Sequence, residues 1–503
     1  MPDQRVIVVG AGVGGLAAAL ELAAQGQEVW VFDAADSPGG KLRQLRMGGA
    51  LLDAGPTVFT MRWVFDELFA RIGEVLDQHL TMRRIRTLAR HAWGPDQRLD
   101  LFADIQASAE AIGDFAGARE AAGYRAFCAR ARQIYNTLEQ PFLRGARPNP
   151  LSLSWRVGQR GLVGFTRISP FGSMWQALGK YFRDPRLHQL FGRYATYCGS
   201  SPFLSPATLM LVAHVEQEGV WLLDDGMHAL AVTLEQLARQ RGATFRYGAP
   251  VRNIITRGGR ASGVELVNGE QFDAKAVIFN GDAAALASGL LGPGVAPAVR
   301  RHDPTQRTLS ARTWHLVTRT QGFPLLRHNV FFSGDYGGEF AQLHQRSLPA
   351  DPTVYVCAQD RGDGDDAPPR DMERLMILAN APATGDAGDM APAELARHAA
   401  ATQRRMATSG LRVQDDLDTA MHTGPQDFGR MFPATGGALY GPASHGWMAS
   451  FRRPGARTRL AGLYLAGGST HPGPGVPMAV LSGGHAVASV LQDISARHPA
   501  RTV

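Results

Sequence analysis

The stretch VIVVGAGVGGLAAALELAAQGQEVWVFD, residues 6–33, determines how the rest of the chain folds. Its first four residues form an unbroken apolar, β-branched run, which is typical of a central parallel strand covered on both faces. A glycine-rich turn follows, then an apolar helix over 16–24 and a second strand over 29–32 that ends at Asp33. This order predicts the strand, helix and parallel strand that open a dinucleotide-binding fold.

The glycines of this turn have separate tasks. Gly10 allows a tight turn, Gly12 lets the backbone approach a pyrophosphate, and Gly15 brings the helix close to the strand. The helix N-terminus offers unpaired N–H groups to the phosphates, and Asp33 is placed to accept hydrogen bonds from the ribose hydroxyls. A signal peptide is the alternative, but the glycines interrupt the apolar run and Glu21 and a second strand follow it.

Composition and length favour a folded protein of two domains. The chain has 503 residues, of which 45% are hydrophobic and 19% charged. Three cysteines without a CxxC pair predict a reducing compartment, no disulfide framework and no metal site. No apolar run reaches the ~18 residues of a membrane-spanning helix, which predicts a soluble or peripheral protein.

The positive charge is concentrated between residues 141 and 194. This segment has nine basic residues and one acid, Asp184, within a chain of net charge +7. Basic residues among aromatic rings suit a surface that lies on anionic lipid headgroups. Alternatively, the rings are core and the arginines cover it. Nucleic acid would use similar residues, but no nucleic-acid module accompanies them, and we expect none to bind. The rings are Phe142, Trp155, Phe165, Phe171, Trp175, Tyr181, Phe182 and Phe191.

Residues 37–43, SPGGKLR, indicate which dinucleotide is bound. A second glycine pair directly after the acid is not needed to hold NAD. It resembles the GG motif of FAD-dependent amine oxidases and carotenoid desaturases, in which this loop runs beside the phosphates and ribityl chain of the flavin. The resemblance implies that Lys41 and Arg43 offset phosphate charge. The alternative is a solvated basic loop.

Residues 53–57, DAGPT, strongly resemble a signature of the phytoene desaturase family, in which this turn approaches the flavin. The following Thr-Met-Arg resembles the branch that acts on hydroxylated or methoxylated carotenoids. Arg62 would then lie at the mouth of the flavin site and steady a reduced, negative isoalloxazine. Alternatively, Arg62 is a surface residue that caps the helix expected to follow it.

Three later segments continue the resemblance. The strands expected around 251–255 and 276–279 look like the second FAD-domain segment, in which the Val251 backbone contacts the adenine and Asn280 ends the last strand. HNVFFSGDY, residues 328–336, resembles carotenoid desaturases that act on hydroxylated intermediates. LYLAGGSTHPGPGVPM, residues 463–478, resembles the flavin loop of the family, with a helix start facing the flavin pyrimidine edge.

The resemblance therefore covers nearly the whole chain and implies the phytoene desaturase family. It implies a Rossmann-like FAD-binding α/β domain of amine oxidase/GDI-like architecture over 1–103, 216–290 and 456–503. A helical, membrane-facing insertion is expected over 104–215 and a mixed-sheet substrate domain over 291–455. The implied FAD-binding residues are Gly10, Gly12, Gly14, Gly15, Asp33, Gly39, Gly40, Lys41, Arg43, Gly55, Pro56, Thr57, Val251, Asn280, Gly467, Gly468, Val476, Pro477 and Met478.

The activity implied is oxidation of a C40 carotenoid, taken from an anionic membrane at the cytoplasmic side, with a quinone or oxygen as final acceptor. For 1-hydroxy- or 1-methoxycarotenoids the new double bond joins C3 and C4. No Asp, Glu or His stands out by its spacing as the base. The candidate catalytic residues are Arg62, in the role given above, and His471 as a base, although we favour a loop-holding role for His471. The alternatives are phytoene as substrate, an amine oxidase, or a lipid-binding protein without activity.

Overall fold

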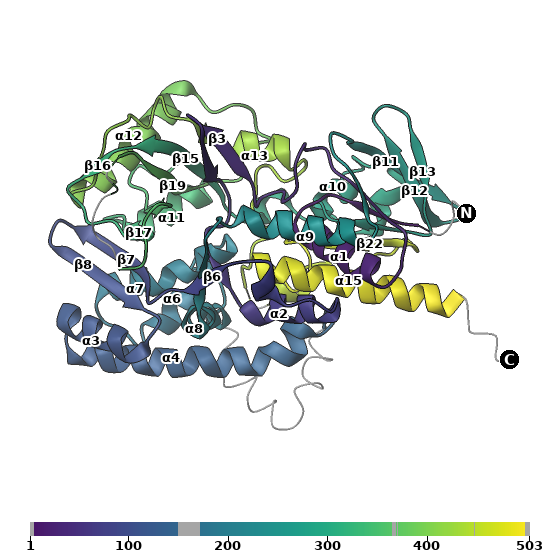
Figure 1. Cartoon of the computed structure of the whole chain (residues 1–503). Coiled ribbons are helices and arrows are strands. Elements are labelled where there is room, and N and C mark those ends of the chain that lie inside the picture. The colour runs from purple at the N-terminus through teal and green to yellow at the C-terminus, as the bar shows by residue number, and fades with distance from the viewer. Residues whose placement is uncertain (1–4, 149–171, 365–368, 370, 447, 498–503) are drawn as a thin grey trace.

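A computed structural model of the chain describes residues 5–148, 172–364, 369, 371–446 and 448–497. One domain is organised around a five-stranded parallel sheet (Figure 1). Three distant stretches of sequence supply its strands, as the resemblance implies. In sheet order these are β10 (Thr244–Arg246), β2 (Val29–Phe32), β1 (Val6–Val9), β14 (Ala276–Phe279) and β22 (Leu463–Leu465).

Both faces of this sheet are buried, which explains the unbroken apolar strands. One face packs against α1 (Val13–Ala24), α9 (His228–Gln240) and α15 (Val476–Arg497), which lie side by side (Figure 1). The other face packs against a three-stranded antiparallel sheet. That sheet consists of β11 (Val251–Arg257), β12 (Arg260–Leu266) and β13 (Gln271–Asp273).

The second domain is built on a seven-stranded mixed sheet. Only the pairing of β17 with β7 is parallel. In sheet order the strands are β21 (His422–Thr423), β15 (Ser310–Thr318), β19 (Glu373–Ala381), β18 (Val354–Ala358), β17 (His328–Phe331), β7 (Thr87–Gly94) and β8 (Gln97–Phe102).

The hairpin of β7 and β8 corrects one expected boundary. Residues up to 103 were assigned to the FAD domain, whereas this hairpin extends the sheet of the substrate domain through the pairing of Val330 with His91. A strand pattern in a sequence contains no information about the distant strand with which it pairs.

The two faces of the seven-stranded sheet have different covers. α12 (Pro392–Thr408) packs on one face, around Trp314 and Ile377. Helices lie toward the other face near Val330 and Phe332. They include α3 (Ile105–Ala116), α4 (Ala118–Leu138), α6 (Met174–Leu178), α7 (Pro185–Gly192), α8 (Leu211–Glu218) and the 3-10 turns Arg193–Cys198 and Ala207–Met210.

The remaining elements are short strands and helices. They are β3 (Gln44–Met47), β4 (Ala50–Asp53), β5 (Phe59–Thr60), α2 (Arg62–Arg71), β6 (Met82–Arg84), β9 (Val220–Leu223), α10 (Ala283–Ala287), β16 (Thr320–Gln321), α11 (Tyr336–His344), β20 (Arg412–Val413), α13 (Pro425–Met431) and α14 (Ala449–Arg452), with single helical turns at Leu76–Gln78, Glu139–Arg144, Pro293–Ala298 and Pro304–Gln306.

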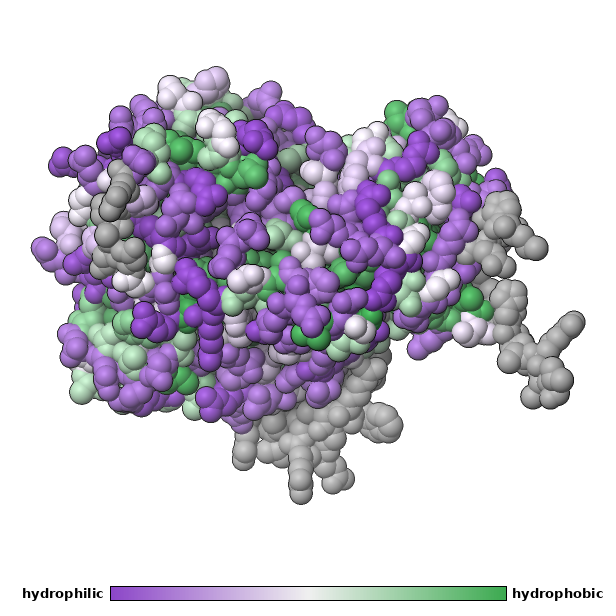
Figure 2. Space-filling view, in the orientation of Figure 1, coloured by the Kyte–Doolittle hydropathy of each residue, from purple (hydrophilic) through white to green (hydrophobic). Residues whose placement is uncertain are grey.

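The basic aromatic segment is only partly described: Phe182 and Phe191 are core, whereas Phe142, Trp175 and Tyr181 are half-buried. Phe182 and Phe191 are 1% and 0% exposed and stack on each other, so for them the core alternative is confirmed and the lipid-boundary prediction is wrong. The surface seen in Figure 2 is mainly polar with scattered apolar side chains. No helix among the described residues is long and apolar enough to cross a bilayer. Trp155, Arg156, Arg160, Phe165, Arg167 and Phe171 lie outside the described residues.

Candidate active site

Asn280 lies where the glycine-rich segments meet. Its side-chain amide donates a hydrogen bond to the carbonyl oxygen of Gly10 (3.2 Å). A Cβ atom on Gly14 would lie 2.8 Å from Asn280 Oδ1 and 2.9 Å from the backbone nitrogen of Gly467. The N-terminal turn, the end of β14 and the loop after β22 are therefore in contact, and only bare backbone allows this approach.

The second glycine pair and the DAGPT turn extend this contact. Gly39 forms a bridge with Gly12, and a Cβ on Gly40 would lie 3.3 Å from the Gly12 Cα atom. A Cβ on Gly55 would lie only 1.9 Å from the carbonyl oxygen of Lys41. The two motifs thus lie directly beside the first, in the order in which a long dinucleotide would pass them.

Asp33 is the residue expected at the adenosine end of the site. Its carboxylate accepts hydrogen bonds from the backbone N–H groups of Ala11 (2.5 Å) and Ala35 (2.8 Å), and burial raises its pKa although these bonds lower it. The backbone at 248–249 donates to the carbonyl oxygens of Ala35 and Asp33. This pairing leads directly into Val251, so the two residues expected at the ribose and adenine lie at the same end of the sheet.

These residues fit a flavin dinucleotide. Helix α1 begins at Gly12 without a side-chain cap and without an acid in its first turn, which leaves its first N–H groups for a phosphate. Beside Gly468 there is open space, because a Cβ atom built there would meet no atom within 4 Å in the part of the chain that the structure describes. Backbone N–H donors thus occur where the motifs predict the phosphates of the cofactor, and open space occurs where they predict its flavin ring.

The two basic side chains of the GG loop extend toward the second domain. The Lys41 ammonium donates to the carbonyl oxygen of Leu439 and lies 4.9 Å from the Phe432 ring, and burial lowers its pKa. Arg43 donates to Thr423 Oγ1 (3.0 Å). Both cations therefore have protein partners, and a role on the phosphates stays a prediction.

The structure supports the loop-holding alternative for His471. This residue is 2% exposed, and its Nε2 donates to the carbonyl oxygen of Gly145 (2.9 Å). Its ring packs edge-on against Phe142, with centroids 4.9 Å apart. Burial lowers its pKa to about 4, so the ring is neutral at neutral pH. The imidazole thus ties the turn at 142–145 to the loop that leads into α15.

Arg62 is held by surface ion pairs. It is the first residue of α2, and its guanidinium contacts the carboxylates of Asp77 (2.6 Å) and Asp66 (3.3 Å). These two carboxylates balance the positive charge of the Arg62 guanidinium. The surface alternative for Arg62 is the one that the structure supports, because both carboxylates are themselves substantially exposed.

A polar cluster on the seven-stranded sheet was not predicted. The Tyr355 hydroxyl bonds to Thr57 Oγ1 (2.7 Å) and to His328 Nδ1 (2.8 Å), so it connects the DAGPT turn to the HNVFF strand. The guanidinium of Arg193 lies 5.5 Å from the centroid of the Tyr355 ring. It also donates a hydrogen bond to the Tyr197 hydroxyl (3.0 Å). Thr57, Arg193 and Tyr355 are far apart in the sequence and form no recognisable motif. The one indication in the sequence is a histidine and asparagine within an otherwise apolar strand.

This face of the sheet borders internal space. Tyr355 and Leu378 are paired neighbours on the central strands β18 and β19, yet both side chains are half-buried rather than fully covered. Burial raises the pKa of Tyr355 well above its ordinary value. A cavity of about 10 Å³ lies beside Arg193.

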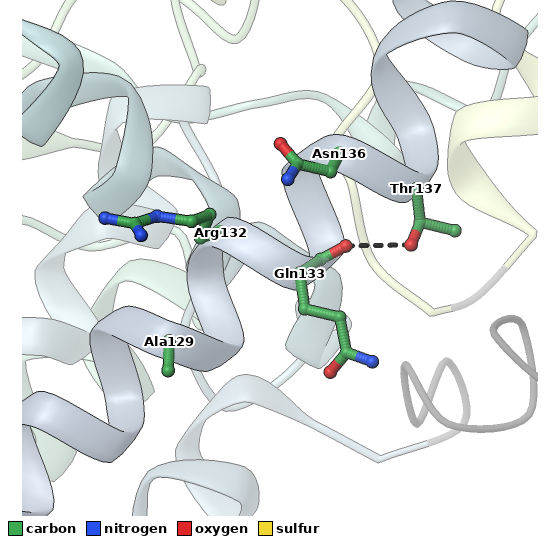
Figure 3. Close-up of a pocket in the computed structure, with 5 residues that line it drawn as sticks. All are labelled: Ala129, Arg132, Gln133, Asn136 and Thr137. Atoms are coloured by element: carbon green, nitrogen blue, oxygen red, sulfur yellow. Dashed lines mark hydrogen bonds between the residues drawn. The ribbon is translucent and has the colours of Figure 1, made fainter.

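A larger hollow, of about 420 Å³, lies on the polar side of α4 and is separate from this site (Figure 3). None of its described lining residues belongs to the glycine-rich segments or to the polar cluster. They are Ala129, Arg132, Gln133, Asn136 and Thr137.

Known proteins resemble the chain over its whole length. The family described as flavin containing amine oxidoreductase matches residues 13–491. Hydroxyneurosporene desaturase of Rubrivivax gelatinosus is 52% identical, over 99% of this chain and 95% of its own. A zeta-carotene-forming phytoene desaturase of Myxococcus xanthus is 32% identical (95% and 92% covered), and a 1-hydroxycarotenoid 3,4-desaturase of a Flavobacterium species is 29% identical (95% and 97%).

The solved structure of putrescine oxidase bound to putrescine matches with a TM-score of 0.60 at 16% identity, covering 98% of this chain and 99% of that one. That likeness confirms the amine oxidase fold and nothing more. The flavin-containing family confirms FAD as the cofactor. The chain belongs to the flavin-containing amine oxidoreductase family, and within it to the group that includes the hydroxyneurosporene desaturases.

Proposed function

We propose that this protein is an FAD-dependent desaturase that introduces a C3–C4 double bond into 1-hydroxy- or 1-methoxycarotenoids. The similarity to hydroxyneurosporene desaturase over nearly the whole chain carries the proposal. The successive contacts of four glycine-containing motifs, of which two meet at Asn280, and the partly uncovered sheet face at Tyr355 support it.

FAD would supply the oxidising power by accepting a hydride from C4, and a base would take up the proton that leaves C3. C4 is allylic to the existing 5,6 double bond, so the positive charge that develops there is delocalised. The protein positions the polyene, excludes water and aims the start of α15 at the cofactor. The cofactor-binding roles of Val476, Pro477 and Met478 at that helix start are part of this proposal.

The proposed setting is the cytoplasmic surface of the inner membrane, where a C40 substrate dissolves and a quinone or oxygen reoxidises the flavin. The basic segment over 141–194 would dock the enzyme on anionic lipid through those of its arginines that face outward. Flotation of the enzyme with liposomes of graded anionic lipid content tests this step. Binding that does not depend on anionic lipid would contradict the electrostatic docking.

The central experiment is incubation of purified, FAD-loaded enzyme with 1-hydroxyneurosporene in liposomes, with a quinone or oxygen as acceptor. Extension of the polyene shifts the carotenoid absorption to longer wavelength, and product analysis locates the new bond. Phytoene in a parallel incubation tests the alternative substrate suggested by the more distant phytoene desaturase relative. Conversion of phytoene without conversion of 1-hydroxyneurosporene would overturn the substrate assignment.

A further inference from the structure

Arg193 is an unusual residue for the interior of a site that binds a hydrocarbon. It lies at the start of the turn Arg193–Cys198, within the segment whose charges were expected at a membrane surface. Instead, its guanidinium lies 5.0 Å from the centroid of the Tyr197 ring and 5.5 Å from that of Tyr355, and it lines a small cavity. Among the described residues, no carboxylate forms an ion pair with it.

The nearest acid is already engaged. Glu216 is 8% exposed and accepts a hydrogen bond from the Tyr194 hydroxyl (2.7 Å). Arg193 donates one hydrogen bond, to Tyr197, although a guanidinium carries five N–H groups. The side chain therefore has donors to spare, inside the protein and beside a cavity of about 10 Å³, which is about the size of one oxygen-bearing group.

Apolar and polar walls meet at this cavity. Leu88, Leu101 and Leu190 line it on the apolar side, and Arg193, Tyr197 and Glu216, whose carboxylate is bonded to Tyr194, line it on the polar side. Such a mixture suits the end of a hydrocarbon chain that carries a single oxygen. A pure polyene has no acceptor for these donors, and burying them without a partner is costly.

We propose that Arg193, flanked by Tyr197 and Tyr355, binds the oxygen substituent at the end of the polyene, a tertiary hydroxyl or its methyl ether. Both forms of the oxygen accept a hydrogen bond from a guanidinium. The inference rests on the proposed function and adds to it the residues that distinguish an oxygenated substrate from a plain hydrocarbon.

The position of the cluster agrees with the chemistry of that substrate. Three bonds separate the oxygen on C1 from C3, so the oxygen site must lie close to the reacting carbons. Thr57 belongs to the turn expected beside the flavin, and its hydroxyl is bonded to Tyr355. The chain of contacts from Thr57 through Tyr355 to Arg193 therefore connects the expected reaction centre to the oxygen site.

The test compares kcat/KM for 1-hydroxyneurosporene with kcat/KM for neurosporene, which lacks the oxygen. We expect the wild type to prefer the hydroxylated substrate. Arg193→Gln should lower that preference by about 10- to 100-fold, the effect of losing a hydrogen bond to a charged group, and Arg193→Lys should restore part of it. Tyr355→Phe and Tyr197→Phe are gentler variants that should each lower the preference by a smaller factor.

Tyr336→Phe is the matched control, because the Tyr336 hydroxyl is buried and has no described hydrogen-bond partner. It should leave the preference unchanged. An equal loss on both substrates in the Arg193, Tyr197 and Tyr355 variants would overturn the inference and indicate a structural role. A wild type that converts both substrates equally well would refute the inference while leaving the proposed desaturase intact. Conversion of neither would refute both.

Discussion

Around Asn280, bare backbone from distant segments comes within contact distance, whereas around Tyr355 long side chains from distant elements meet through hydrogen bonds and rings. The first region is built from glycines whose spacing can be recognised along the chain. The second depends on strand register, which brings residues together without leaving a motif. The comparison indicates that cofactor binding is specified locally and substrate choice by tertiary packing.

Gly14→Val should have the largest effect. Its side chain would overlap Asn280 Oδ1 and the backbone at Gly467 and Ala479, each closer than 3.0 Å to a Cβ alone. We expect FAD affinity to fall by at least ~100-fold, as for severe overpacking. Flavin absorbance of the purified protein measures the loss. Gly94→Val is the control, because a Cβ atom there would meet nothing within 4 Å. Full flavin content in Gly14→Val would contradict the close approach of Gly14 to Asn280 and Gly467.

Leu378→Trp should separate the two regions. The half-buried Leu378 faces the same side of the sheet as Tyr355, so a larger ring there would occupy space proposed for the substrate. We expect carotenoid turnover to fall by about 10-fold or more, with flavin content unchanged. The control is Ile377→Val on the opposite face, which should cost roughly 1 kcal/mol of stability and leave turnover intact. Unaltered turnover in Leu378→Trp would argue against a channel on this face.

His471→Gln should make the cofactor region less sensitive to acid. The folded-state pKa of His471 is about 4, below its unfolded value, so the unfolded chain takes up the proton first and stability is lost as pH falls. Between about pH 7 and about pH 5 the wild type should lose about 2 kcal/mol more than the variant, measured by urea unfolding. Glutamine keeps an N–H donor for Gly145. Parallel losses in both proteins would show that His471 does not titrate as described.

Arg62→Ala should have the smallest effect. Its ion pairs with Asp66 and Asp77 are exposed, and such pairs contribute less than about 1 kcal/mol. Flavin content and carotenoid turnover should match the wild type. A large fall in turnover at normal flavin content would restore Arg62 as a catalytic candidate.

Much of the cofactor region was predictable because glycine and strand patterns are local. The strand expected over 29–32 has those bounds, and the helix expected over 16–24 begins three residues earlier, at Val13. The pairing of β7 with β17 was not predictable, since a strand pattern does not name its partner. Arg193 was missed because charge and aromatic content look the same in sequence whether a residue faces lipid or an internal cavity.

The order of assembly follows from the packing of α15 against α1. The last long helix of the chain and the first are neighbours, and β22 joins a sheet that begins with residue 6. During synthesis the N-terminal unit therefore emerges from the ribosome long before its covering helix exists. The cofactor site is therefore complete only after α15 has been made, and until then the side of α1 that α15 covers stays exposed.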